Sequence, residues 1–88
     1  MDVPGDIQGR YVERRKKDLE NCLLSLERGN FMELEKVGHQ LKGNGVTFGF
    51  DELSAIGRQM EKAAHTKNLP DLERALELFS QWVSGHIN

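Results

Sequence analysis

His39, Lys42 and Gly43 lie close enough along the chain to share one face of a helix. A neutral imidazole is a good nucleophile near neutral pH, because the ordinary pKa of histidine is about 6.5. A lysine one helical turn away can hold phosphoryl oxygens by charge, and phosphoryl transfer depends mainly on positioning and charge stabilisation. Gly43 leaves bare backbone beside the ring, so a partner can come close. These residues are suited to a histidine that accepts a phosphoryl group.

Metal chemistry is the weaker interpretation of the histidines. His65 and His86 could join His39 in a metal site. However, the chain has no paired His-x3-His or Cys-x2-Cys spacing. Cys22 falls on an apolar stripe, which favours a core thiol over a nucleophile. We therefore expect no resident metal and no cofactor.

Apolar residues recur with the helical period in four segments, and these must position the histidine. The first segment runs roughly from Ile7 to Arg28, and Gly29 can end it in the left-handed conformation. Asn30 and Glu33 form a capping-box pattern, which predicts a second helix beginning near Phe31. The second helix weakens around residues 45–47.

The remaining boundaries follow from turn and capping residues. The segment 48–50 is predicted to be a turn, with Asp51 as the N-cap of a third helix. Residues 67–69 form the next break, and Pro70 fits the first turn of a fourth helix. The expected inner faces are Tyr11, Val12, Leu19, Cys22, Leu23 and Leu26; Leu34, Val37 and Leu41; Leu53, Ile56, Met60 and Ala63 or Ala64; and Leu72, Ala75, Leu76, Phe79, Trp82 and Val83.

Four helices with short links predict an all-α fold, an antiparallel up-down-up-down four-helix bundle. The alternative is a three-helix bundle against which the first segment docks loosely. We expect one domain over residues 1–88, because 88 residues are too few for a two-domain enzyme.

The second helix contains three glycines, Gly38, Gly43 and Gly45. Each glycine in a helix interior costs about 1 kcal/mol relative to alanine. Either another group approaches this helix closely, or the helix ends soon after Leu41.

His39 points away from the inner face of the second helix and should face solvent. Met32 and Val46 fall on the same outer face. Exposed apolar atoms on both sides of a histidine suit a docking surface.

Composition excludes several classes of function. The formal charge of −2 argues against a dedicated nucleic-acid binder, and there is no apolar run long enough to span a membrane. The N-terminus lacks an apolar signal region and the single cysteine has no partner, so we expect a cytoplasmic protein. A basic run could meet an acidic partner or RNA, but interspersed acidic residues favour a solvated face; it comprises Arg10, Arg14, Arg15, Lys16 and Lys17.

The central part of the chain, residues 31–65, resembles the histidine-containing phosphotransfer (HPt) domain family. The resemblance rests on residues 39–43, His-Gln-Leu-Lys-Gly, followed by Gly49, Leu53 and Met60-Glu61. Residues 48–53 also look like the turn of stand-alone bacterial members. Two positions depart from the family pattern, because Gly38 stands where Ala is frequent and Met60 where Leu is common.

The resemblance implies roles for four residues. His39 would accept a phosphoryl group from an aspartyl phosphate on a receiver domain and pass it to another receiver. Lys42 would bind the phosphoryl oxygens, and Gly43 would leave room for the partner. Glu61 matches a residue that hydrogen-bonds the imidazole in some chemotaxis members, although Arg58 or His65 would compete for it as partners on the same helix.

The resulting hypothesis is a phosphorelay intermediate that is not itself an enzyme, since the sequence has no nucleotide-binding glycine loop and no Asp cluster for Mg²⁺. Mg²⁺ is expected on the partner receiver. The implied partners are response-regulator receiver domains, a hybrid sensor histidine kinase, or both, and we expect a monomer that binds no nucleic acid and enters no membrane. The alternative is a helical adaptor that docks a signalling partner through Met32 and Val46 without being phosphorylated.

Overall fold

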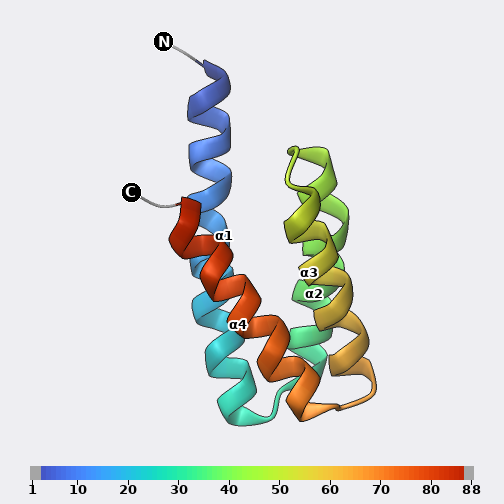
Figure 1. The fold of residues 1–88 in the computed structure, drawn as a ribbon. Helices are drawn as coiled ribbons and strands as arrows, with labels where there is room; N and C mark the ends of the chain where they lie inside the picture. Colours follow the sequence, from blue (N-terminus) through green and yellow to red (C-terminus); the bar gives the residue numbers. More distant parts are fainter. Residues whose placement is uncertain (1–2, 87–88) are drawn as a thin grey trace.

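The computed structural model describes residues 3–86, with side chains from residue 7 onward, and consists of four helices. They are α1 (Val3–Arg28), α2 (Phe31–Thr47), α3 (Asp51–His65) and α4 (Leu69–His86), and no strand occurs within these residues. The chain runs down α1, up α2, down α3 and up α4 (Figure 1). The predicted antiparallel four-helix bundle is therefore confirmed. The prediction of one domain over 1–88 includes residues 1–2 and 87–88, which lie outside the described part.

The link between α1 and α2 has the predicted glycine turn and only half of the predicted capping box. Gly29 has a φ of 69°, which suits a residue without a Cβ. Asn30 Oδ1 accepts a hydrogen bond from the Glu33 N–H at 3.1 Å, so half of the predicted capping box is present. The Glu33 carboxylate does not return to Asn30, because it accepts a hydrogen bond from Asn21 of α1 at 2.8 Å. Glu33 thus ties α2 to α1.

The prediction that Asp51 is the N-cap of α3 was wrong. Asp51 is the first helical residue, and the cap position belongs to Phe50, which makes no side-chain capping bond. The link closes through backbone, since the Phe50 N–H donates to the Gly45 carbonyl at 2.7 Å and its own carbonyl accepts from Ser54. Gly49 supports the turn with a φ of 86°. Asp51 still lies in the first turn, where its charge is favourable.

The third link ends in a side-chain cap. Lys67 has a φ of 55°, and Asn68 Oδ1 accepts a hydrogen bond from the Asp71 N–H at 3.1 Å. Pro70 lies in the first turn of α4, as predicted.

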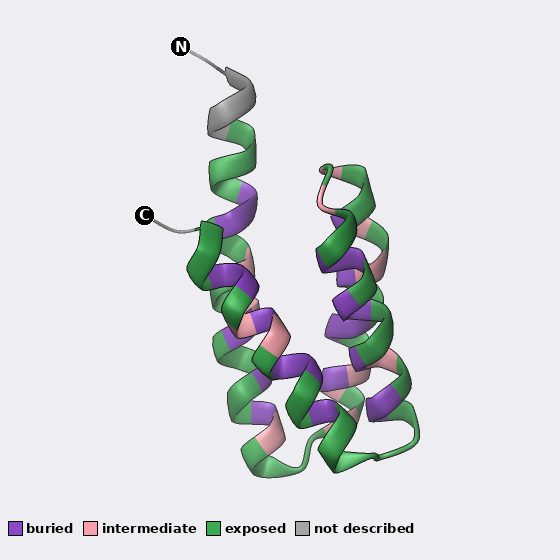
Figure 2. Cartoon of the chain, in the orientation of Figure 1, coloured by how far each residue is buried: buried purple, intermediate pink, exposed green. Residues whose placement is uncertain are grey.

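The core lies between the four helices (Figure 2) and is almost the predicted one. α1 contributes four buried hydrophobic residues, Tyr11, Val12, Leu19 and Cys22, so the three-helix alternative was wrong. Leu23 is the exception, because its side chain is 48% exposed, and Leu26 is only partly buried. Leu19 and Cys22 lie on the face of α1 that packs against the core, and Leu23 lies where that face meets solvent. No helix within residues 3–86 is long and apolar enough to cross a membrane.

Close packing of α3 explains two of the three glycines in α2. A Cβ at Gly38 would lie 2.6 Å from the backbone nitrogen of Glu61, and one at Gly45 would lie 2.8 Å from that of Ser54. Ser54 also donates a hydrogen bond of 2.5 Å to the Lys42 carbonyl. These contacts keep α2 helical to Thr47, so the interpretation that it ends soon after Leu41 was wrong.

Candidate functional site

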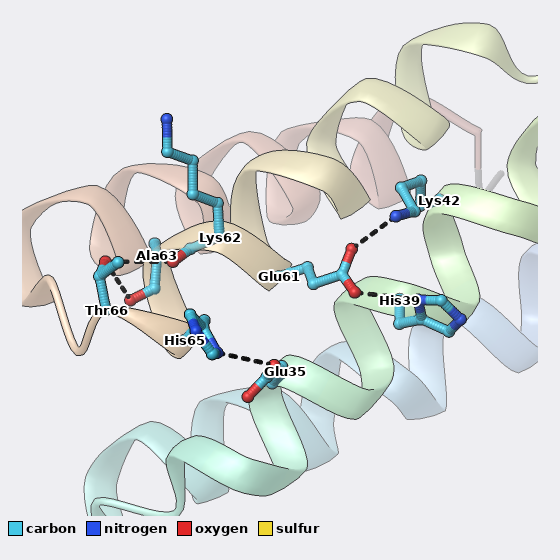
Figure 3. Close-up of polar contacts among 8 residues, drawn as sticks. All are labelled: Glu35, His39, Lys42, Glu61, Lys62, Ala63, His65 and Thr66. Carbon is cyan, nitrogen blue, oxygen red and sulfur yellow. Dashed lines mark hydrogen bonds and ion pairs between the residues drawn. The ribbon is translucent and has the colours of Figure 1, made fainter.

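The predicted residues meet on the outer surface of the α2–α3 pair (Figure 3). His39 and Lys42 project from α2, and Glu61 projects from α3 between them. Glu61 Oε2 lies 2.9 Å from His39 Nδ1, and Glu61 Oε1 lies 2.9 Å from Lys42 Nζ. The His39 side chain is 67% exposed, whereas that of Glu61 is 24% exposed. One carboxylate therefore holds both the imidazole and the lysine at the border of solvent.

The charge of Glu61 determines which nitrogen of His39 is free. The hydrogen bond from Lys42 is the largest cause that lowers the pKa of Glu61, and the hydrogen bond with His39 lowers it further. An ionised carboxylate only accepts hydrogen bonds, so Nδ1 must donate its proton to Oε2. In a neutral imidazole the second nitrogen then carries the lone pair. In the neutral ring this nitrogen is Nε2.

The glycine packing of α2 and α3 sets the reach of Glu61. At Gly38, one residue before His39, a Cβ would lie 3.0 Å from the Cα of Glu61. This separation brings the backbone of α3 against α2 next to the histidine. A short Glu side chain can then reach a ring on the outer face of α2. The site depends on this helix-to-helix distance as well as on the side chains.

The surface around His39 is open and partly apolar. A Cβ at Gly43 would have no heavy atom within 4 Å, so Gly43 serves no packing contact within the described part of the chain. Met32 is 83% exposed and Val46 is 58% exposed, as expected from their positions on the outer face. An approaching molecule would thus meet the imidazole, bare backbone and two apolar side chains.

The sequence left the partner of Glu61 open, and the structure places the alternatives elsewhere. His65 Nδ1 lies 3.2 Å from Glu35 Oε2, which joins α3 to α2 one turn from the His39–Glu61 contact (Figure 3). Arg58 is exposed and forms no ion pair with Glu61 among the residues that the structure describes. Lys42 was predicted beside His39 but not as a partner of Glu61, since nothing in the sequence gives the spacing between helices.

The other candidate groups lie apart from this site. His86 Nδ1 is 2.7 Å from the Trp82 carbonyl oxygen, and its ring stacks on that of Trp82. Within residues 3–86, no group of three or more His, Cys, Asp or Glu residues is placed to hold a metal ion. Cys22 is fully buried, and burial raises the pKa of its thiol to about 12, as fits a core residue.

The basic run of α1 is partly engaged within its own helix. Arg15 lies 2.8 Å from Asp18 and stands 4.4 Å from the centre of the Tyr11 ring. Tyr11 in turn donates a hydrogen bond of 2.5 Å to Asn44 of α2. These contacts brace α1 against α2 near the turn at residues 48–50.

Comparison with known protein families places the chain in one of them. The family model described as the Hpt domain matches residues 6–86 of the 88-residue chain. No curated protein and no solved structure matches the chain. Hpt domains are helical phosphotransfer modules of two-component signalling that interact with receiver domains and kinases. Because the match includes residues from all four helices and nearly the whole chain, the chain belongs to the Hpt domain family.

Proposed function

We propose that His39 carries a phosphoryl group between the aspartates of receiver domains, with Nε2 as the accepting atom. The observation that carries this proposal is the hydrogen bond between His39 Nδ1 and the Glu61 carboxylate, which in the neutral imidazole leaves the lone pair on Nε2 of a side chain that is 67% exposed. A nucleophile held in one tautomer and one orientation needs little reorganisation before it reacts.

The proposed step transfers a phosphoryl group from the aspartyl phosphate of a receiver to His39. The Nε2 lone pair attacks the phosphorus of the receiver's aspartyl phosphate, a P–N bond forms, and the P–O bond to the aspartate breaks. The aspartate leaves as a carboxylate, and the Nδ1 proton stays in its hydrogen bond to Glu61. The product ring then carries a positive charge shared with Nδ1, which the negative Glu61 stabilises. The reverse step delivers the group to another receiver.

Lys42 is proposed to bind the phosphoryl oxygens once they arrive. In the unphosphorylated protein its ammonium lies 2.9 Å from Glu61 Oε1, so it is already held beside the ring. Three N–H donors allow an ammonium to contact the carboxylate and a phosphoryl oxygen together. Lys42 thus acts as a positioned charge, while Glu61 acts as a positioning residue.

Docking is proposed to use the outer face of α2. Gly43 leaves the backbone accessible, and Met32 and Val46 provide exposed apolar contacts. The partner would be a response-regulator receiver domain or a hybrid sensor kinase, and Mg²⁺ would be bound by the receiver. In this proposal the domain is a monomeric phosphocarrier and has no catalytic machinery of its own.

The test is transfer from a radiolabelled, phosphorylated receiver to this protein. We expect an acid-labile, alkali-stable phosphate on His39, and ¹⁵N spectra of the imidazole should assign the P–N bond to Nε2. His65→Gln serves as the matched control and should retain uptake, because His65 faces Glu35 in place of Glu61. Attachment at Nδ1, or label that remains in a His39→Gln variant, would contradict the assignment.

A second candidate is a docking adaptor that is never phosphorylated. The exposure of Met32 and Val46 favours it as much as it favours a phosphocarrier. The two differ in two results. An adaptor would take up no label, and its affinity for a receiver would be the same in the wild type and in the His39→Gln variant.

A further inference from the structure

A second surface lies between α1 and α4, away from the histidine. The helices follow one another around the bundle in the order α1, α2, α3, α4, and α4 returns to α1. His39 and Glu61 join the outer edges of α2 and α3, so the outer side of the α1–α4 pair is the opposite side of the bundle (Figure 1). A molecule bound there would leave the face of His39 accessible.

This surface is a shallow groove with an apolar floor. It measures about 370 Å³ and is formed by Leu23, Leu26, Leu76, Glu73, Glu77, Ser80 and Gln81. Leu23 is 48% exposed although the apolar period places it with the core. Leu69 is also 48% exposed and lies one turn before Glu73 on the same side of α4. Leu69 thus adds an exposed apolar side chain to the side of α4 that carries Glu73.

Carboxylates lie on both helices that form the groove. Glu73 and Glu77 line the groove from α4. On α1, the exposed Glu20 and Glu27 lie three residues before and four residues after Leu23, and therefore on its side of the helix.

Few positive charges offset these carboxylates. Arg74 lies 3.3 Å from Glu77, but both side chains are more than half exposed, and such pairs are weak. Lys16 lies two turns before Leu23, towards the far end of the groove. Exposed carboxylates thus flank the groove from α4 and from the neighbouring turns of α1.

We propose that this leucine groove is a docking site for a basic amphipathic helix of another protein. A helix can lay an apolar stripe on Leu23, Leu26 and Leu76, while flanking Lys or Arg residues face the carboxylates. A second copy of this chain fits less well, because a twofold contact would set acidic edges against each other. This inference does not depend on the phosphorylation of His39.

The experiment uses labelled model peptides and the whole protein. One helical peptide of about 18 residues has a leucine stripe flanked by lysines, and its matched control has glutamates in place of the lysines. We expect the basic peptide to bind, with an affinity that falls as salt is added, and the acidic peptide to bind at least about tenfold more weakly. Amide shift changes in NMR spectra should be confined to α1 and α4.

Three variants test the location. The Leu23→Ser variant should bind the basic peptide at least about tenfold more weakly than the wild type. The same loss of affinity is expected for a second variant that combines Glu73→Lys with Glu77→Lys. Met32→Ser, on the opposite side, should leave its affinity unchanged. Leu23→Ser should also accept phosphate on His39 at the native rate, so a failure here is distinguishable from a failure of the phosphocarrier proposal. Four outcomes would each overturn the proposal. They are equal binding of both peptides, no binding of the basic peptide, amide shift changes centred on α2 and α3, and a dimer seen in sedimentation that Leu23→Ser disrupts.

Discussion

Gly38 on α2 and Gly57 on α3 face each other so closely that a Cβ on Gly57 would lie 2.7 Å from the Gly38 carbonyl oxygen. The same Cβ would lie 2.5 Å from the backbone nitrogen of Lys42. Both contacts are with backbone, which cannot swing aside as a side chain can. The pair therefore fixes the separation of the two helices at the level of the His39–Glu61 contact.

Gly57→Ala should destabilise the bundle by about 1–3 kcal/mol, because the added methyl group must push α2 and α3 apart. The increase in helix propensity, at most about 1 kcal/mol, does not offset this clash. Thermal or urea unfolding gives the change in free energy. Gly43→Ala is the matched control, since its Cβ has open space and should stabilise α2. Equal stabilisation by both variants would show that the helices are not in close contact.

Gly43→Leu should impair docking without lowering stability. The helix should keep its stability or gain some, because nothing lies within 4 Å of the new Cβ. Transfer from a phosphorylated receiver should fall by about a hundredfold, since a bulky group next to His39 displaces the partner. Urea unfolding and the initial rate of label uptake measure the two effects. Full transfer by this variant would exclude a close approach at Gly43.

The helical period predicted the bundle and most of its core, because each apolar stripe in this chain is buried by a neighbouring helix. It could not predict the exposure of Leu23, which depends on how α1 and α4 cross. The sequence identified Gly38 and Gly45 as unusual but did not specify what approaches them. Gly57 was not singled out, although its spacing of four residues from Glu61 places both on one face of α3.

The site was predicted through spacing within α2, and spacing of that kind is independent of the tertiary fold. His39, Lys42 and Gly43 needed only one helix to be brought together. The contact of Glu61 with both His39 and Lys42 depends on the register between two helices, which no local pattern encodes. For the same reason, the sequence did not predict that Glu35 would pair with His65.

Cys22 should be inert in the native state. Its thiol is fully buried beside Met60, and burial raises its pKa to about 12. Labelling by a thiol reagent at pH 8 should therefore occur only through unfolding and should accelerate with denaturant. Because the unfolded thiol ionises near the ordinary value of 9.0 and the folded thiol does not, stability should decline as pH rises above about 9. Rapid labelling without denaturant would place Cys22 at the surface.

His39→Gln should abolish phosphate uptake while changing the free energy of unfolding by no more than about 0.5 kcal/mol. The side chain is 67% exposed and belongs to no core contact, so little packing is lost. An amide lacks the nucleophilic nitrogen but retains polarity. One thermal melt and one labelling gel measure both quantities. A strongly destabilised variant would mean that His39 supports the core.

Lys42→Ala should slow transfer by about a hundredfold without unfolding the protein, because a positioned charge is removed from the arriving phosphoryl group. It should also raise the pKa of Glu61 towards its ordinary value of 4.5, and by more than His39→Gln does, because the hydrogen bond from Lys42 is the largest cause that lowers it. Carboxyl ¹³C shifts followed through a pH titration of the wild type and both variants give this order. Transfer at the wild-type rate by Lys42→Ala would contradict the role assigned to Lys42.

The lowered pKa of Glu61 also predicts how the stability of the protein depends on pH. A carboxylate with a depressed folded-state pKa contributes stability above the ordinary value of 4.5, and this contribution is lost as pH falls through the lower folded value. Wild type should therefore exceed Glu61→Gln in stability at pH 7, and the difference should shrink once the pH falls below the ordinary value of 4.5. In Lys42→Ala this pH-dependent contribution should be smaller, and its loss should be complete at a higher pH, because the folded-state pKa of Glu61 then lies closer to 4.5. A stability difference that persists unchanged at pH 2 would show that Glu61 acts through packing and not through its charge on Lys42 and His39.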